Sequence, residues 1–128
     1  MGVGLMATSL TKAEMARYIA TARQRQQLEQ QQKEQRQRQG WKVARQAAAL
    51  LKERFHVQQV WLFGSMLTLR RVHPHSDIDL AVKGLAPAQY LEAVVELLDL
   101  SDFSVDLVQI EYAQPSLLET IEQQGIEL

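Results

Sequence analysis

The spacing of apolar residues separates a polar N-terminal part of the chain from a longer part with regular core positions. Thr11 and Glu14 have the spacing of a capping box, which predicts a helix start. From Gln24 to Gln39, nine of sixteen residues are Gln and Leu28 is the only large apolar one. Because Gln, Lys, Arg and Glu favour helix, we expect a long helix here with a polar surface all round.

Gly40 interrupts this polar run, and the pattern changes after it. From Trp41 to Phe55, apolar residues recur three and four positions apart, which predicts an amphipathic helix. We expect Gly40 to end the first helix and separate it from the second. The sequence therefore predicts two parts, a Gln- and Arg-rich helical arm at 1–40 and a folded domain at 41–128.

Strand and helix patterns alternate through the rest of the domain. Apolar runs predict three strands, at 56–63, 77–82 and 103–110. Helical spacing predicts a helix that begins near Pro87 and a last one at 115–123, which Gly125 ends. This order fits a small α/β or α+β domain. We predict the α+β class, with a short mixed sheet packed by helices on one face and preceded by the long polar helix.

Length and composition limit the class of protein. A chain of 128 residues has room for one compact domain and an appendage. It contains no Cys, which excludes disulfides, thiolate zinc sites and a cysteine nucleophile. Residues 1–6 lack a charged leader and a sustained apolar run, so we expect no signal peptide. No segment reaches the length of a membrane span, and we expect a cytoplasmic protein with no membrane partner.

The net charge of −1 hides an asymmetry between the two halves of the chain. Residues 1–56 hold eleven Lys and Arg against four Glu, a net charge of +7, and residues 57–128 have a net charge of −8. The basic half could bind nucleic acid or an acidic partner. A solvated helix face is the favoured interpretation, because Gln and Glu separate the basic residues and no aromatic residues lie between them.

Candidate chemistry begins where the first strand of the domain ends. Gly64 and Ser65 follow that strand, and backbone N–H groups with a hydroxyl in such a turn can hold phosphate. Asp77 and Asp79 lie two positions apart on the next strand and therefore point to the same face. Two adjacent carboxylates are costly without a cation, and oxygen ligands suit Mg²⁺. Together these residues predict a site for a metal–nucleoside triphosphate.

Asp106 interrupts the apolar pattern of the third strand. A single Asp in a strand can simply face solvent, as can the Asp77 and Asp79 pair on an exposed edge. If the third strand lies beside the second, however, the three carboxylates form one cluster. Such a cluster could bind two metal ions or accept a proton from an attacking hydroxyl.

The ordered set of these residues resembles the minimal nucleotidyltransferase family, the smallest branch of the DNA polymerase β-like superfamily. Its hallmark is Gly-Ser, a spacer, Asp-x-Asp and a third Asp on a later strand. The resemblance covers residues 41–128, and the matching positions are Gly64, Ser65, Asp77, Asp79 and Asp106. The resemblance implies that the three Asp bind two Mg²⁺ ions and that the substrate is an NTP, for which we expect ATP. It also implies that Asp106 acts as base and that Gly64 and Ser65 hold the β- and γ-phosphates.

The chain departs from the family after the Gly-Ser pair. Family members commonly have Arg directly after the serine and Gly a few residues later, where this chain has Met66 and Leu69. The missing Arg removes a phosphate contact that the resemblance implies. Arg70 and Arg71 follow in the same loop and are candidates to replace it, although a solvated loop explains them equally well.

The resemblance also implies a partner. Characterised family members act as antitoxins that transfer AMP to a tyrosine of a HEPN-domain toxin, so we expect a HEPN-domain protein as partner. The alternative is a catalytically silent antitoxin-like subunit that neutralises its partner by complex formation; Met66 favours this alternative and the intact acidic triad disfavours it. The sequence leaves open whether the chain also forms a homo-oligomer.

Overall fold

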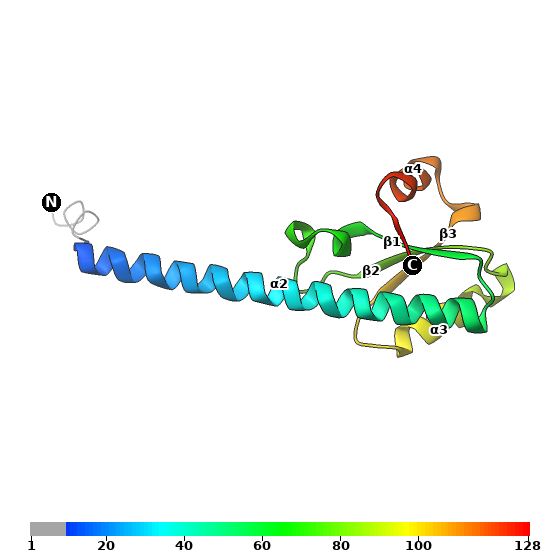
Figure 1. Cartoon of the computed structure of the whole chain (residues 1–128), viewed down its shortest axis with the longest axis horizontal. Coiled ribbons are helices and arrows are strands. Elements are labelled where there is room, and N and C mark those ends of the chain that lie inside the picture. The colour runs from blue at the N-terminus through cyan, green and yellow to red at the C-terminus, as the bar shows by residue number, and fades with distance from the viewer. Residues whose placement is uncertain (1–9) are drawn as a thin grey trace. The chain divides into compact units, whose positions relative to one another are not determined.

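The computed structural model describes residues 10–128, so the expectation for residues 1–6 lies outside the described part. The chain divides into one compact unit that ends at Gln32 and a second that runs from Lys33 to Leu128. The predicted α+β class is confirmed (Figure 1). The main elements are α2 (Lys12–Arg54), β1 (Gln59–Phe63), β2 (Ile78–Lys83), α3 (Tyr90–Asp99), β3 (Val105–Gln109), α4 (Pro115–Gln124) and β4 (Ile126–Glu127). No helix within residues 10–128 has the length and apolar character that crossing a membrane requires.

Helix α2 begins as predicted and continues through Gly40. The Thr11 hydroxyl accepts a hydrogen bond from the Glu14 N–H at 3.1 Å, which caps the helix start. The prediction that Gly40 ends the first helix is wrong. Gly40 is buried, and a Cβ atom on it would lie 2.5 Å from the sulfur of Met66. Glycine is therefore present because Met66 packs directly on the helix backbone.

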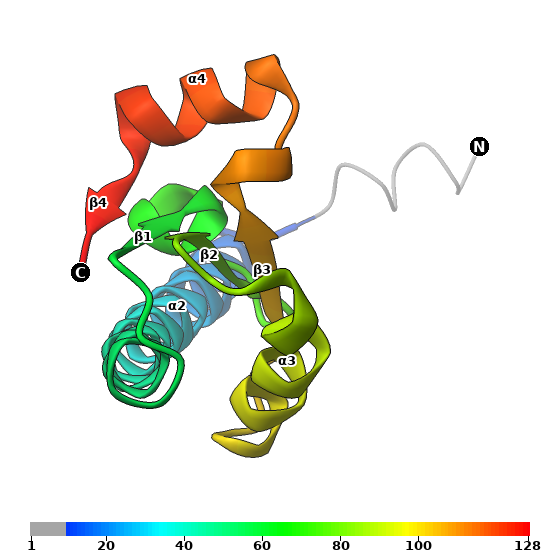
Figure 2. The same ribbon diagram turned by 90° about the vertical axis from the view of Figure 1, so that its right-hand side faces the viewer.

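The sheet has four strands in the order β3-β2-β1-β4 and is mixed, as predicted. β1 pairs antiparallel with β2 and β4, whereas β2 and β3 are parallel. The Lys33–Arg54 part of α2 and α3 lie on one face of the sheet, and α4 lies on the other (Figure 2). The prediction of helices on one face of the sheet holds for α2 and α3, whereas α4 packs on the opposite face in a smaller cluster. β4 was absent from the prediction.

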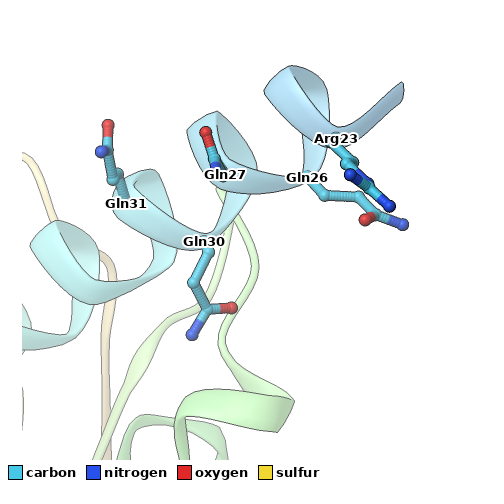
Figure 3. A pocket seen from close by; sticks show the side chains of 5 residues that line it. All are labelled: Arg23, Gln26, Gln27, Gln30 and Gln31. Atoms are coloured by element: carbon cyan, nitrogen blue, oxygen red, sulfur yellow. The ribbon is translucent and has the colours of Figure 1, made fainter. Parts of the chain in front are cut away.

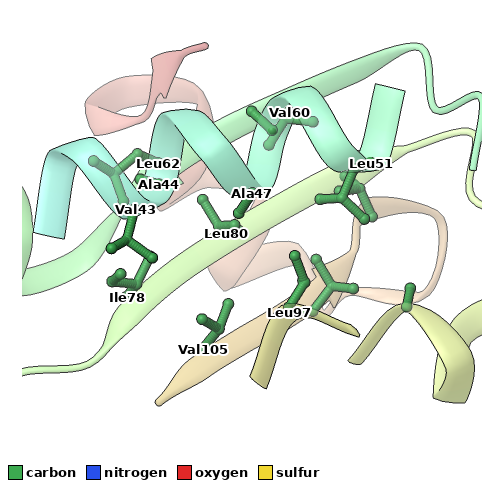
Figure 4. Close-up of a cluster of buried hydrophobic side chains, with 14 of the residues drawn as sticks. Val43, Ala44, Ala47, Leu51, Val60, Leu62, Ile78, Leu80, Leu97 and Val105 are labelled. Atoms are coloured by element: carbon green, nitrogen blue, oxygen red, sulfur yellow. The ribbon is translucent and has the colours of Figure 1, made fainter. Parts of the chain in front are cut away.

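The alternation of β2 decides which side chains enter the main core. Ile78, Leu80 and Val82 pack against the apolar stripe of α2, part of which is drawn in Figure 4. Ala81 points the other way and packs in the cluster that α4 covers. Since side chains alternate along a strand, Asp79 lies on the α4 side of the sheet together with Ala81.

Candidate functional site

Strand register brings the predicted carboxylates to one end of the sheet. In the parallel pair of β2 and β3, Asp79 stands directly opposite Asp106. Val105 and Leu107 pack in the core with α2, so Asp106, which lies between them, points to the α4 side, as Asp79 does. Asp77 is exposed and precedes β2 by one residue. The strand that carries Asp106 therefore lies beside the one that carries Asp79.

The carboxylate of Asp79 interacts electrostatically with the charged side chains around it. Burial, and after it the carboxylates of Asp106 and Asp77, together raise the pKa of Asp79 to about 6. The Arg71 guanidinium opposes this increase. Two carboxylates and one arginine thus interact with Asp79. Mutual repulsion among carboxylates is the condition under which a bound cation is most stabilising.

Gly64 lies against the Asp79 carboxylate. It has a φ of +82°, which L-residues with a side chain rarely adopt. A Cβ atom at this position would overlap Oδ2 of Asp79 and lie 3.0 Å from its Cγ. Ser65 is the next residue, at the start of the 3-10 helix η1 (Gly64–Leu67), and is partly exposed. The Gly-Ser turn and the aspartates, which are distant in sequence, therefore share one site.

Replacing Gly64 by Ala is expected to cost stability and to displace the Asp79 carboxylate. The positive φ alone costs about 1–3 kcal/mol. Gly84 provides a matched control, because it has a φ of +88° and its added Cβ would lie 3.0 Å from the Gln58 side chain, with none of the three site aspartates among its nearest neighbours. We expect both alanine variants to have a lower melting temperature and only Gly64→Ala to lose about a hundredfold in nucleotidyl transfer. Equal activity of the two variants would contradict the role of the close contact.

The residues after Ser65 separate into site and core. Arg70 and Arg71 are both exposed and lie in the short helical turn at 69–71. Arg71 is near enough to lower the pKa of Asp79. Met66, which stands where the family has Arg, is completely buried. Its side chain enters the core against Gly40. Of the two arginines, Arg71 is therefore the better candidate for a phosphate contact.

The carboxylates fit Mg²⁺ as a donor set. Among residues 10–128, no group of three or more His, Asp or Glu side chains is close enough together to hold a metal ion. Mg²⁺ does not require one, because it commonly uses one or two carboxylates and completes its shell with water and substrate phosphates. The raised pKa of Asp79, caused in part by Asp106 and Asp77, shows that added positive charge would be favourable here.

Sequence reasoning missed the contribution of α2 to this site. Arg36 donates a hydrogen bond to the Ser76 carbonyl at 3.0 Å, next to Asp77. Gln37 and Trp41 both donate to the Met66 carbonyl, at 3.1 and 3.2 Å. The one sequence signal for these contacts was a glycine within a helix-forming run, which often marks close packing.

A depression elsewhere on α2 has a different character. Figure 3 shows the side chains that line it, namely Arg23, Gln26, Gln27, Gln30 and Gln31. All five lie within about two turns of one helix, so they line an open surface and no enclosed cavity. Amide and guanidinium groups here can hydrogen-bond to water, and no carboxylate lines this depression.

The fold and the site define a nucleotidyltransferase-type domain, in which a Gly-Ser turn faces aspartates from neighbouring strands. Residues 45–128 match the family described as polymerase beta, nucleotidyltransferase, and the chain belongs to this family. No curated protein sequence matches the chain.

Several solved structures that resemble the chain are toxin–antitoxin complexes. One is a mutant of MntA–HpeT in which two aspartates are changed to glutamate, with 27% identity, a TM-score of 0.56, and coverage of 66% of this chain and 70% of that chain. A second is a toxin–antitoxin with AMP-PNP, with 31% identity, a TM-score of 0.54, and coverage of 62% and 66%. A third is MntA–HepT, with 27% identity, a TM-score of 0.52, and coverage of 66% and 68%.

Proposed function

We propose that this protein is a Mg²⁺-dependent nucleotidyltransferase that moves AMP from ATP to a hydroxyl group of an acceptor. The observation that carries the proposal is the strand register, which sets Asp79 opposite Asp106 and next to the Gly64 turn. Family membership supports nucleotidyl transfer as the reaction class. The similar complex with AMP-PNP, an ATP analogue, supports ATP as the nucleotide.

Asp77, Asp79 and Asp106 would hold two Mg²⁺ ions in the proposed site. The ions would offset the negative charge that develops on the attacking and leaving oxygens. Gly64 and Ser65 would bind the β- and γ-phosphates through backbone N–H and hydroxyl groups. Catalysis would then depend on positioning and on charge neutralisation, as in phosphoryl transfer generally.

The proposed step forms one bond and breaks one. The acceptor oxygen attacks the α-phosphorus of ATP, the bond from that phosphorus to the bridging oxygen breaks, and pyrophosphate leaves with the electron pair. Asp106 takes the proton of the hydroxyl. Asp106 is exposed, so a group on a partner protein can reach its carboxylate.

We propose a tyrosine of a HEPN-domain toxin as the acceptor, with this chain as the antitoxin. The similar structures support a partner of the HepT kind, since they are MntA–HpeT and MntA–HepT complexes. The two aspartates changed in the MntA–HpeT mutant are separated by one residue, as Asp77 and Asp79 are. A domain of this size leaves the acceptor side of the site open for a partner.

The direct test is transfer of label from α-³²P-labelled NTPs to the HEPN-domain partner in the presence of Mg²⁺. We expect label on the partner with ATP, loss of label when its acceptor tyrosine becomes Phe, and no label with Asp77→Ala. Absence of transfer from all four NTPs, with wild type and Asp77→Ala indistinguishable, would rule the activity out.

Burial of Met66 favours one second candidate function, a silent antitoxin that neutralises its partner by binding alone. The side chain that replaces the family Arg points into the core, so the phosphate contact at that position is missing. Under this alternative, Asp77→Ala/Asp79→Ala would still protect cells from the toxin. The enzyme hypothesis predicts that protection is lost although the complex still forms.

A further inference from the structure

One arginine of α2 connects the starts of the two strands that carry the carboxylates. The Arg36 guanidinium stacks on the Phe103 ring, with 3.8 Å from its central carbon to the ring centroid. Its Nη2 donates to the Ser76 carbonyl at 3.0 Å. Ser76 is buried and precedes Asp77 and β2, whereas Phe103 precedes β3. Arg36 thus contacts both segments at the end of the sheet where the aspartates lie.

These contacts fix the peptide units on either side of Asp77. The Ser76 carbonyl belongs to the same peptide as the Asp77 N–H, so the hydrogen bond from Arg36 orients that peptide plane. The following peptide is held by the Ile78 N–H, which donates to the Ser104 carbonyl at 3.0 Å. Asp77 lies outside the strand proper, and its Cα position therefore depends on these two hydrogen bonds.

Ser76 itself is held within its loop. Its N–H donates to the His73 carbonyl at 2.9 Å, and its hydroxyl accepts a hydrogen bond from the His73 N–H at 2.8 Å. The loop before Asp77 is therefore a closed turn whose free carbonyl points to Arg36. A movement of Arg36 would move the turn and Asp77 together.

Stability alone is a poor explanation for this arrangement. The Nε atom of Arg36 is buried and has no hydrogen-bond partner among residues 10–128. An unsatisfied buried N–H of this kind lowers stability. Cation–π stacking on Phe103 offsets part of that loss. The arrangement does fix geometry, because the planar guanidinium of Arg36 stacks on one segment and donates a hydrogen bond to the other at the same time.

We propose that Arg36 is a positioning residue that holds Asp77 in its metal-binding orientation. The proposal rests on the nucleotidyl transfer proposed above. The same helix also holds the other half of the site, since Gln37 and Trp41 donate to the Met66 carbonyl in the turn that begins at Gly64. Helix α2 between Arg36 and Trp41 therefore sets the phosphate turn and the aspartates relative to each other. The first of these residues lies nine positions before the family match begins.

The test compares Arg36→Gln with Arg38→Gln in the full chain. Arg38 is exposed on the same helix, so the control removes the same charge without the contacts to Phe103 and Ser76. Binding of Mn²⁺ is measured by electron paramagnetic resonance without nucleotide, and hydrogen exchange of the Ile78 amide is measured by NMR. Loss of a residue that orients a metal ligand typically weakens metal binding 10–100-fold.

We expect Arg36→Gln to weaken Mn²⁺ binding about tenfold and to speed Ile78 exchange about tenfold, while Arg38→Gln matches wild type. Arg36→Lys should fall between them, since Lys can donate but cannot stack as a plane. In the transfer assay, kcat should fall and the KM for ATP should change little. Unchanged Mn²⁺ binding and Ile78 exchange in Arg36→Gln would overturn the proposal.

Two further outcomes keep the two proposals separate. If wild type transfers no nucleotide, the proposed function fails, and faster Ile78 exchange in Arg36→Gln still supports the positioning role. If Arg36→Gln does not fold, Phe103→Leu removes the stacking surface while it keeps Arg36. We then expect weaker Mn²⁺ binding by Phe103→Leu, and wild-type binding by this variant would overturn the role of the stack.

Discussion

Replacing Asp79 by Asn is expected to reduce nucleotidyl transfer about a thousandfold and to make the metal-free protein more stable. The loss follows because Asp79 is the central carboxylate of the proposed site, opposite Asp106 and against Gly64. The gain follows because burial, and after it the charges of Asp106 and Asp77, destabilise ionised Asp79 and raise its pKa to about 6. Asn keeps the shape of the side chain and removes the charge.

The pH dependence gives the sign of this effect. The folded-state pKa of Asp79 lies above its ordinary value of 3.8, so the folded protein binds this proton more tightly than the unfolded chain. The corresponding stabilisation is fully present below about pH 4 and is lost as the pH rises through about 6. After allowance for screening of a half-exposed group, the difference amounts to about 1 kcal/mol, or roughly 4 °C in melting temperature.

Thermal unfolding from pH 4 to pH 8, with EDTA and then with Mg²⁺ and an ATP analogue, measures both effects. Without metal, Asp79→Asn should lose less stability than wild type as the pH rises from 4 to 8 and should melt higher at pH 7.5. With metal and nucleotide, wild type should gain stability and the variant should not. Asp102→Asn, at an exposed position away from the strands, is the control. A variant that melts lower than wild type at pH 7.5 without metal would show that repulsion at Asp79 is not the dominant effect.

The site was readable from the sequence where local rules apply. Alternation along the strand expected at 77–82 predicted that Asp77 and Asp79 share one face, and the apolar pattern around Asp106 predicted that it lies on a strand. The sequence did not predict that β2 and β3 are neighbours, because no local pattern specifies a parallel pairing of two strands. The prediction of one carboxylate cluster therefore depended on that pairing. Once that pairing exists, the register follows from the need to bury one face of each strand.

The contacts of α2 with the site could not be read in this way. Arg36 and Gln37 lie in a run of Gln and charged residues whose composition is that of an exposed helix. Their partners are backbone carbonyls of Ser76 and Met66, forty and twenty-nine positions away, and a carbonyl has no sequence signature. Strand β4 could not be predicted for a different reason: it has two residues, and a segment of this length shows no periodic pattern.

Restoring the family arginine by Met66→Arg is expected to unfold or strongly destabilise the domain rather than to increase activity. The sequence comparison with the family predicts only that Met66 removes the phosphate contact of the Arg that it replaces. In the structure its side chain is completely buried, packed on the backbone of Gly40. A guanidinium in this position would be surrounded by apolar core residues and by the helix. Burial of an unpaired charge costs several kcal/mol, a large fraction of the 5–15 kcal/mol that stabilises a typical domain.

The alternative for the new arginine is to leave the core, and this would damage the site. The Met66 carbonyl accepts hydrogen bonds from Gln37 and Trp41, so turning residue 66 outward would break both and move the turn that begins at Gly64. Met66→Leu, which conserves volume, is the control and should cost less than about 1.5 kcal/mol. Urea unfolding of both variants, together with the transfer assay, measures the difference. A Met66→Arg protein that is as stable as Met66→Leu and transfers nucleotide faster than wild type would mean that residue 66 can reach the phosphates. In that case the replacement of the family Arg by Met66 would have lowered catalytic activity, and the packing of Met66 on Gly40 would be a consequence of that replacement.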